Sequence, residues 1–137
     1  MGDYRFVHEE RVRWSDLDAM GVLNNAVYLT LFEQARFHYF HALGLMAGAR
    51  FPFVLAATRV DFLRPVGADA LLVIGARVTR LGRKSFAMEY EVRDRGESVA
   101  TGDATLVCVD AALKSVAIDD DFREAVAGFE GIEPGPA

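Results

Sequence analysis

Apolar side chains recur at helical spacing in one uninterrupted stretch near the N-terminus, residues 25–43, which contains no Pro or Gly before Gly44. One broad apolar face is formed by Tyr28, Leu29, Phe32, Ala35, Tyr39, Phe40 and Leu43. The opposite face is polar and carries Thr30, Glu33, Gln34, His38 and His41. Gly44 is a natural residue to end a helix. The pattern predicts a long helix over residues 25–43, with an apolar face wide enough to be enclosed by a sheet.

The rest of the chain favours strands, because apolar and polar residues alternate there. The predicted strands are residues 6–14, 53–64, 70–81, 85–95 and 97–110, with 112–117 as a candidate continuation of the last. Residues 47–52 connect the long helix to the second strand, and Asp94-Arg95-Gly96 forms a hairpin turn. A short helix is expected at residues 119–129, followed by a loose, flexible tail at 130–137.

This order of elements predicts an α+β fold in which one helix packs on a curved antiparallel sheet, with the last four strands as a meander. We expect a single domain over residues 1–137, with its core at about 6–118, because no linker divides the chain. The edges and open face of a lone sheet favour pairing of the chain into a dimer.

Composition narrows the functional classes. With 52% hydrophobic residues the chain is globular, and no apolar run reaches the roughly 20 residues that span a bilayer. MGDYRFVHEE lacks the basic and apolar regions of a signal peptide, which predicts a cytoplasmic protein. The single cysteine, Cys108, lies in an apolar strand, so we expect a buried and inert thiol.

A net charge of −5 argues against general nucleic-acid binding. There is no zinc-type Cys/His spacing and no Walker or dinucleotide glycine pattern. A small anionic ligand stays open, because basic residues cluster locally at Arg77, Arg80, Arg83 and Lys84.

Candidate chemistry lies in the turn before the long helix. Asp16 and Asp18 are followed by Gly21 and then by Asn24 and Asn25. A carboxylate ahead of a helix start can act as a base or nucleophile, and the unpaired amides there can receive developing negative charge. Each aspartate can also simply cap the turn, and Asp16 is the better candidate for that structural role.

These residues carry a family resemblance. The segment DLDAMGVLNNAVYLTLFEQAR, together with VDFLRPV and RLGRKSF, resembles the hotdog-fold acyl-CoA thioesterases. The nearest branch is the 4-hydroxybenzoyl-CoA thioesterase type, which includes bacterial short-chain thioesterases of the Tol–Pal operon. The likeness covers residues 6–110. It implies one long central helix wrapped by a curved five-stranded antiparallel sheet, an acyl-CoA substrate and a homodimer or homotetramer. It implies no metal and no redox cofactor, since CoA enters as part of the substrate.

The resemblance also assigns roles to residues. It places the catalytic carboxylate on Asp18, and the amide that polarises the thioester carbonyl on Asn25. Contacts to the CoA phosphates map onto Arg83, Lys84 and Ser85, and Arg59 and Arg64 are weaker candidates for that role. Ala19 and Leu23 depart from the Pro and His of some relatives, so no single substrate is implied. Another branch uses a helical Glu, for which Glu33 is a secondary candidate.

Several alternatives stay open at the level of sequence. Asp18 can activate water as a general base or attack the carbonyl to form an anhydride. The chain can bind acyl-CoA without cleaving it, or it can be an interaction domain in which both aspartates are caps. A hydratase is disfavoured, because that chemistry needs a His–Asp pair and the turn contains no His. The acyl group, and the choice between CoA and acyl carrier protein, are not specified.

Overall fold

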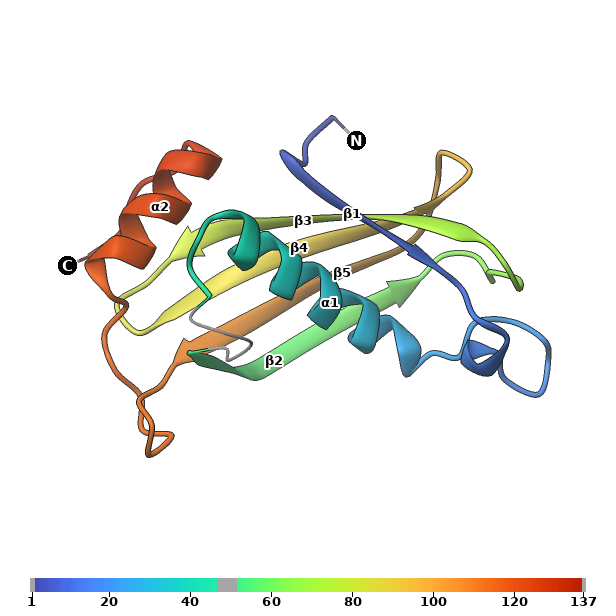
Figure 1. Ribbon diagram of the computed structural model, residues 1–137, viewed down its shortest axis with the longest axis horizontal. Coiled ribbons are helices and arrows are strands. Elements are labelled where there is room, and N and C mark those ends of the chain that lie inside the picture. Colours follow the sequence, from blue (N-terminus) through green and yellow to red (C-terminus); the bar gives the residue numbers. More distant parts are fainter. Residues whose placement is uncertain (1, 47–51, 137) are drawn as a thin grey trace.

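The computed structural model describes residues 2–46 and 52–136, and in it one long helix lies across one face of a curved sheet (Figure 1). The elements in order are β1 (Phe6–Arg11), a single 3-10 turn η1 (Trp14–Asp16), α1 (Val27–Ala42), β2 (Phe53–Phe62), β3 (Leu71–Leu81), β4 (Ser85–Asp94), β5 (Glu97–Cys108) and α2 (Asp120–Glu130). The sheet is five-stranded and antiparallel. The predicted hotdog fold is therefore confirmed. The predicted connector at residues 47–52 lies, apart from Pro52, outside the described residues.

The sheet order is β1-β3-β4-β5-β2, which corrects the predicted meander of four strands. Only β3, β4 and β5 follow one another as hairpins, whereas β2 pairs with β5 and lies at the edge. The reason is the connection between β2 and β3, residues 63–70. It contains Pro65 and Gly67, is too long for a tight hairpin, and carries the chain to the other side of the sheet.

Helix α1 approaches the sheet closely because β5 offers a glycine at the contact. A Cβ atom on Gly102 would lie 2.6 Å from Cε2 of Phe32. The Phe32 ring instead stacks on Tyr90 of β4, with ring centroids 4.6 Å apart. Both aromatic residues are fully buried, so this contact anchors the middle of α1 on the middle of the sheet.

The C-terminal helix covers the far end of the same core. Phe122 stacks on Phe40 of α1 at 5.2 Å. At the other end of α2, the Glu130 carboxylate accepts hydrogen bonds from the Tyr39 hydroxyl (2.5 Å) and the Val78 amide (3.0 Å). This carboxylate satisfies β3 beyond the point where β1 ends, since the last β1–β3 pair is Phe6 with Ala76.

Several predicted boundaries were wrong. The first strand ends at Arg11 instead of residue 14, because the chain turns into η1. Residues 112–117 do not continue β5; they fold back, so that Ser115 forms a bridge with Val109. The last helix ends at Glu130 instead of residue 129, and beyond it the Pro134 carbonyl accepts a hydrogen bond from Arg123 at 2.6 Å.

Candidate active site

The candidate site is built on a small hairpin that follows η1. Leu17 and Leu23 form its bridge, and the Asp18 amide donates to the Val22 carbonyl at 2.8 Å. Gly21 takes a positive φ of 76°, which a residue with a Cβ adopts only with strain. The Leu23 amide donates to the Val66 carbonyl (2.8 Å), so the hairpin is fixed to the segment that follows β2.

Asp16 is a structural residue. It is 6% exposed, and its carboxylate accepts from the Arg13 backbone amide (2.8 Å) and from the Arg13 guanidinium at Nε (3.3 Å) and Nη2 (2.9 Å). The Arg13 hydrogen bond lowers the pKa of Asp16 below its ordinary value. Both carboxylate oxygens are occupied, which confirms the capping role predicted for Asp16.

Asp18 differs from Asp16 because it is exposed and only one of its two carboxylate oxygens accepts hydrogen bonds. Its Oδ1 accepts from the amides of Met20 (2.8 Å) and Val22 (3.4 Å), which fixes the side chain on the turn. Its Oδ2 has no partner among the described residues. A carboxylate held by one oxygen and free at the other has a defined position and can still accept a proton or attack a carbon.

Helix α1 begins two residues later than predicted, at Val27, with Ala26 as its N-cap. The asparagines form the turn that leads into it: the Asn24 side chain accepts from the Ala26 amide at 3.0 Å, and the Asn24 carbonyl accepts from the Val27 amide at 3.0 Å. The Asn25 amide donates to no acceptor within the described part of the chain. The predicted free donor is therefore present, although it precedes the first helical turn.

The predicted phosphate contacts lie in the turn between β3 and β4. The Arg83 carbonyl accepts from the Ile118 amide (2.8 Å), and Lys84 Nζ lies 3.5 Å from the Ser115 hydroxyl. Ser85 is the first residue of β4. Backbone bonds thus fix this turn, in which Arg83 is exposed and Lys84 is half-buried.

Within one chain these two groups of residues are far apart. Ser85 aligns through Val107 with Val54 at the start of β2, whereas the Asp18 hairpin is tied to Val66, beyond the end of β2. At about 3.3 Å per residue, β2 alone separates them by roughly 26 Å. Figure 1 shows the same separation: the hairpin and the α2 end lie on opposite sides of the molecule. Asp18 and Asn25 share one end, and Arg83, Lys84 and Ser85 share the other.

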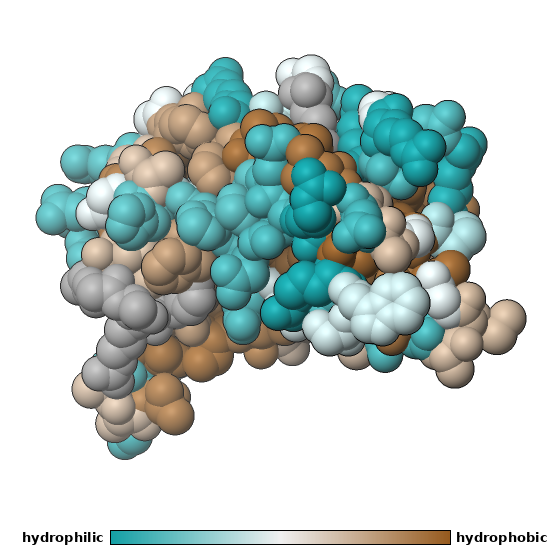
Figure 2. All heavy atoms as spheres, turned by 45° about the vertical axis from the view of Figure 1, so that its right-hand side comes forward, coloured by the Kyte–Doolittle hydropathy of each residue, from teal (hydrophilic) through white to brown (hydrophobic). Residues whose placement is uncertain are grey.

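The edge strand β2 is unusually exposed for an apolar strand. Most of its residues are exposed to solvent, including the apolar side chains of Val54 (43%), Leu55 (43%) and Phe62 (48%). Leu29 of α1 (41%) and Leu63 (55%) are exposed as well. Figure 2 shows hydrophobic atoms along the lower margin of the molecule, where β2 lies in Figure 1. Two further exposed apolar residues, Trp14 (82%) and Met20 (84%), belong to the segment that carries Asp18.

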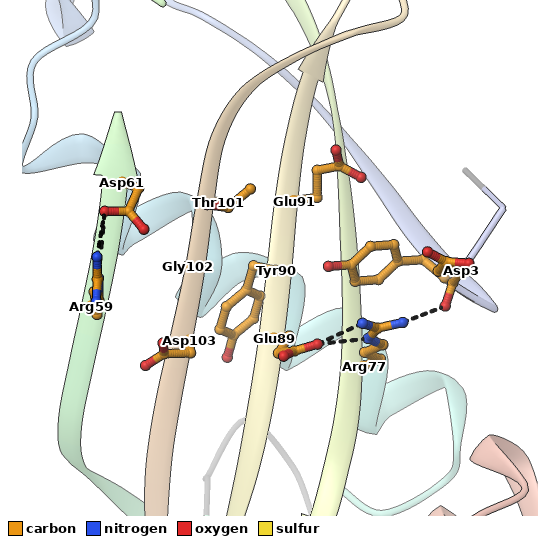
Figure 3. A pocket seen from close by; sticks show the side chains of 11 residues that line it. Asp3, Arg59, Asp61, Arg77, Glu89, Tyr90, Glu91, Thr101, Gly102 and Asp103 are labelled. Carbon is orange, nitrogen blue, oxygen red and sulfur yellow. Dashed lines mark hydrogen bonds and ion pairs between the residues drawn. The ribbon is translucent and has the colours of Figure 1, made fainter. Parts of the chain in front are cut away.

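A hollow lies on the face of the sheet away from α1 (Figure 3). This cavity of about 360 Å³ contains none of the predicted catalytic or phosphate-binding residues apart from Arg59. Its two arginines are paired within the chain: Arg77 donates to Glu89 at 3.0 and 2.6 Å, and Arg59 lies 3.3 Å from Asp61. Paired charges of this kind stabilise a solvated sheet face and leave little free chemistry.

Sequence reasoning missed one buried polar residue, Arg36. It is 6% exposed and lies on the apolar face of α1, where the signal was its helical spacing from Phe32 and Tyr39. Its Nη1 donates to the Tyr90 hydroxyl at 3.0 Å, whereas its Nε has no partner within the part of the chain that is described. Arg36 is therefore a buried cation in the middle of α1, on the side that faces Tyr90 of the sheet.

The remaining candidate chemistry is limited. Cys108 is buried as expected, and burial raises the pKa of its thiol to about 11, which disfavours the reactive thiolate. Residues 2–46 and 52–136 contain no cluster of three or more His, Cys, Asp or Glu side chains that could hold a metal ion. None of the helices in these ranges has the length and hydropathy to cross a bilayer.

Known proteins resemble this chain over almost its full length. Residues 12–126 match the thioesterase-like superfamily. The acyl-CoA thioesterase YbgC of Haemophilus influenzae is 27% identical over 131 residues, which cover 91% of this chain and 96% of that protein. The long-chain acyl-CoA thioesterase FadM of Escherichia coli is 28% identical over 120 residues, covering 83% and 91%.

The fold is shared with solved structures. A thioesterase from Thermus thermophilus, in complex with coenzyme A and Zn, superposes with a TM-score of 0.89 at 33% identity. The match covers 97% of this chain and 99% of that one. The matched region therefore includes both the Asp18 hairpin and the turn between β3 and β4.

Proposed function

This chain belongs to the thioesterase-like superfamily and is a thioester hydrolase, and we propose that it cleaves an acyl-CoA to a free acid and CoA. The family likeness predicted from the sequence is confirmed by these matches. The observation that carries the proposed mechanism is the pairing of a half-engaged carboxylate, Asp18, with an unpaired backbone donor, the Asn25 amide, at one end of α1.

In the proposed reaction the thioester carbonyl oxygen accepts a hydrogen bond from the Asn25 amide. Asp18 removes a proton from a water molecule, and the water oxygen attacks the carbonyl carbon. The negative charge that develops on the carbonyl oxygen is stabilised by the amide, and such a donor typically lowers the activation barrier by about 3 kcal/mol. The C–S bond then breaks, the CoA sulfur takes up the proton, and the acid is released.

The free Oδ2 of Asp18 also suits direct attack. In that case the carboxylate forms an anhydride with the acyl group as CoA leaves, and water then hydrolyses the anhydride. Both routes use the same two residues, and neither involves a metal or a redox cofactor. A single turnover in water enriched with heavy oxygen separates them. If water attacks the Asp18 carbonyl of an anhydride, the label enters the Asp18 carboxylate and the released acid keeps an oxygen from Asp18, whereas the general-base route labels only the acid.

We further propose that the working site is made by two copies of the chain. The outer edge of β2 has no neighbouring strand in the sheet of the described residues, and Val54, Leu55 and Phe62 of this strand are exposed, which favours antiparallel pairing with a second β2. Such pairing reverses one chain relative to the other. The end that carries Asp18 then lies beside the partner's turn with Arg83, Lys84 and Ser85, which explains how CoA phosphates reach basic residues that are distant within one chain.

We propose that the enzyme is cytoplasmic, because Cys108 is not in a disulfide and because of the nature of the acyl-CoA substrate. A tetramer is an alternative to the dimer, and sedimentation measurements distinguish the two.

The test is thiol release from a panel of acyl-CoAs, with short, long and aromatic acyl groups, by the wild type beside Asp18→Asn. We expect turnover of at least one class in the wild type and its collapse in the variant, while CoA binding survives. Binding without turnover in the wild type would instead identify a non-catalytic acyl-CoA-binding protein. Such a protein would use the Asp18 carboxylate only to cap its turn.

A further inference from the structure

Among the buried charged residues of the described chain, Arg36 has the fewest hydrogen-bond partners, although Arg123 also lacks a carboxylate partner. Asp16 is paired with Arg13, and Arg123 donates to the carbonyls of Pro134 (2.6 Å) and Arg83 (3.4 Å). Arg36 has one neutral acceptor, the Tyr90 hydroxyl, and no carboxylate within ion-pairing distance in the described ranges. A buried cation without a counter-charge is costly, so an anion that reached Arg36 would be bound favourably.

A cavity lies beside this residue, between α1 and the edge strand β2. It has a volume of about 140 Å³, and its lining includes Leu29, Phe32, Arg36, Leu55 and Thr58. An apolar cavity of about 150 Å³ accommodates a benzene molecule, so the space suits a group of about six non-hydrogen atoms. The cavity begins at Leu29, one helical turn beyond the Asn25 amide, which is where an acyl group would extend from the thioester carbonyl.

The chemistry of Arg36 selects the kind of group. A guanidinium has only donors, so its ligand must accept hydrogen bonds, and a carboxylate matches it best in charge and geometry. Because a helical side chain leans toward the N-terminus of its helix, Arg36 is directed back toward Leu29 and the site. Apart from Arg36 the lining is mixed: Leu29, Phe32 and Leu55 can contact the methylene groups of a short chain, and Thr30, Glu33 and Thr58 are polar.

We propose that Arg36 binds the distal carboxylate of a short dicarboxylic acyl group, so that the enzyme prefers substrates such as glutaryl-CoA to their monocarboxylic counterparts. This inference rests on the proposed function, because it places the other end of the acyl group at Asn25 and Asp18. It makes Arg36 a specificity residue that contacts the substrate and takes no part in bond cleavage.

Glu33 is the one acidic side chain in the lining. It is exposed, so solvent screens its charge, and it forms no ion pair with Arg36. It still disfavours an incoming carboxylate. Glu33→Gln should therefore strengthen the preference for dicarboxylic acyl groups.

The test is a ratio of affinities, measured by calorimetry with glutaryl-CoA and valeryl-CoA on the Asp18→Asn protein, which binds without depending on turnover. We expect glutaryl-CoA to bind about tenfold to a hundredfold more tightly. Arg36→Met, which keeps the length of the side chain, should bring the ratio close to one, and Arg36→Lys should leave part of it. Arg95→Met, in the exposed turn between β4 and β5, is the matched control.

The outcomes separate the two proposals. A ratio near one in the Asp18→Asn protein, or a ratio that Arg36→Met leaves unchanged, would overturn the role of Arg36. A shift in the dimer dissociation constant without a change in the ratio would overturn it too, because Arg36 would then pair with the partner copy. Failure of the wild type to release thiol from any acyl-CoA counts against the proposed function alone.

Discussion

Asp16 and Asp18 are two residues apart in the same turn, yet they have opposite environments. Asp16 is buried, and both its oxygens are held by Arg13. Asp18 is exposed and keeps one oxygen free. The same side chain thus serves as a fixed structural anchor in one position and as an available reactive group in the next. The difference comes from Arg13 and from the hairpin that turns Asp18 outward.

The largest expected effect separates chemistry from structure at Asp18. Asn keeps the oxygen that accepts from the Met20 amide but cannot act as a base or nucleophile. Asp18→Asn should lower kcat by about 10²–10⁴-fold. Its melting temperature, followed by circular dichroism, should stay close to that of the wild type. A large loss of stability in this variant would mean that Asp18 is a cap like Asp16.

Asp16→Ala should give the reverse result. It removes a backbone cap and an ion pair whose Arg13 side chain is largely exposed, so we expect a loss of about 1–2 kcal/mol in the free energy of unfolding. Urea unfolding measures this loss. At equal amounts of folded protein, turnover should fall far less than in Asp18→Asn. Arg13→Gln is the matched variant, and it should lose only part of the stability because the backbone cap remains.

Gly21→Ala tests whether the shape of the hairpin holds Asp18 in place. The added Cβ meets no atom within 4 Å, so the only penalty is the positive φ of 76°. That strain costs about 1 kcal/mol and is relieved if the hairpin relaxes. We expect a modest loss of stability together with a clear fall in kcat. Gly67→Ala, also free of contacts but without a positive φ, is the control and should change neither quantity by much.

The smallest effect is a pH dependence that belongs to Asp16. The Arg13 hydrogen bond lowers the pKa of Asp16 in the folded state below the ordinary value of 3.8. The unfolded chain therefore binds the proton first as the pH falls, and the stabilisation is present above pH 3.8 and lost below it. The stability difference between the wild type and Asp16→Asn should shrink in acid. A difference that grows as the pH falls would contradict this assignment.

Much of the fold could be predicted because its patterns are local. The periodicity of residues 25–43 and the alternation in β4 identified the helix and the strand within a few residues. The edge position of β2 could not be read in this way. It depends on where the connection after Phe62 carries the chain, and β2 has no burial pattern of its own.

The candidate site was predictable in its residues but not in its assembly. Asp18 and Asn25 were assigned from the family resemblance of the turn, and the structure brings them to one end of α1. Arg83, Lys84 and Ser85 lie at the other end, because strand length separates the two turns. Arg36 was missed because arginine is rarely buried in proteins, so an arginine in a helix is normally expected at the surface.

The central claim is that Asp18, and not Asp16, performs the chemistry. The most direct measurement compares single-turnover thiol release by Asp18→Asn and Asp16→Asn at equal folded fractions, with the best acyl-CoA of the panel. We predict that Asp16→Asn is faster by about a hundredfold or more. Equal rates in the two variants, or a slower Asp16→Asn, would contradict the account.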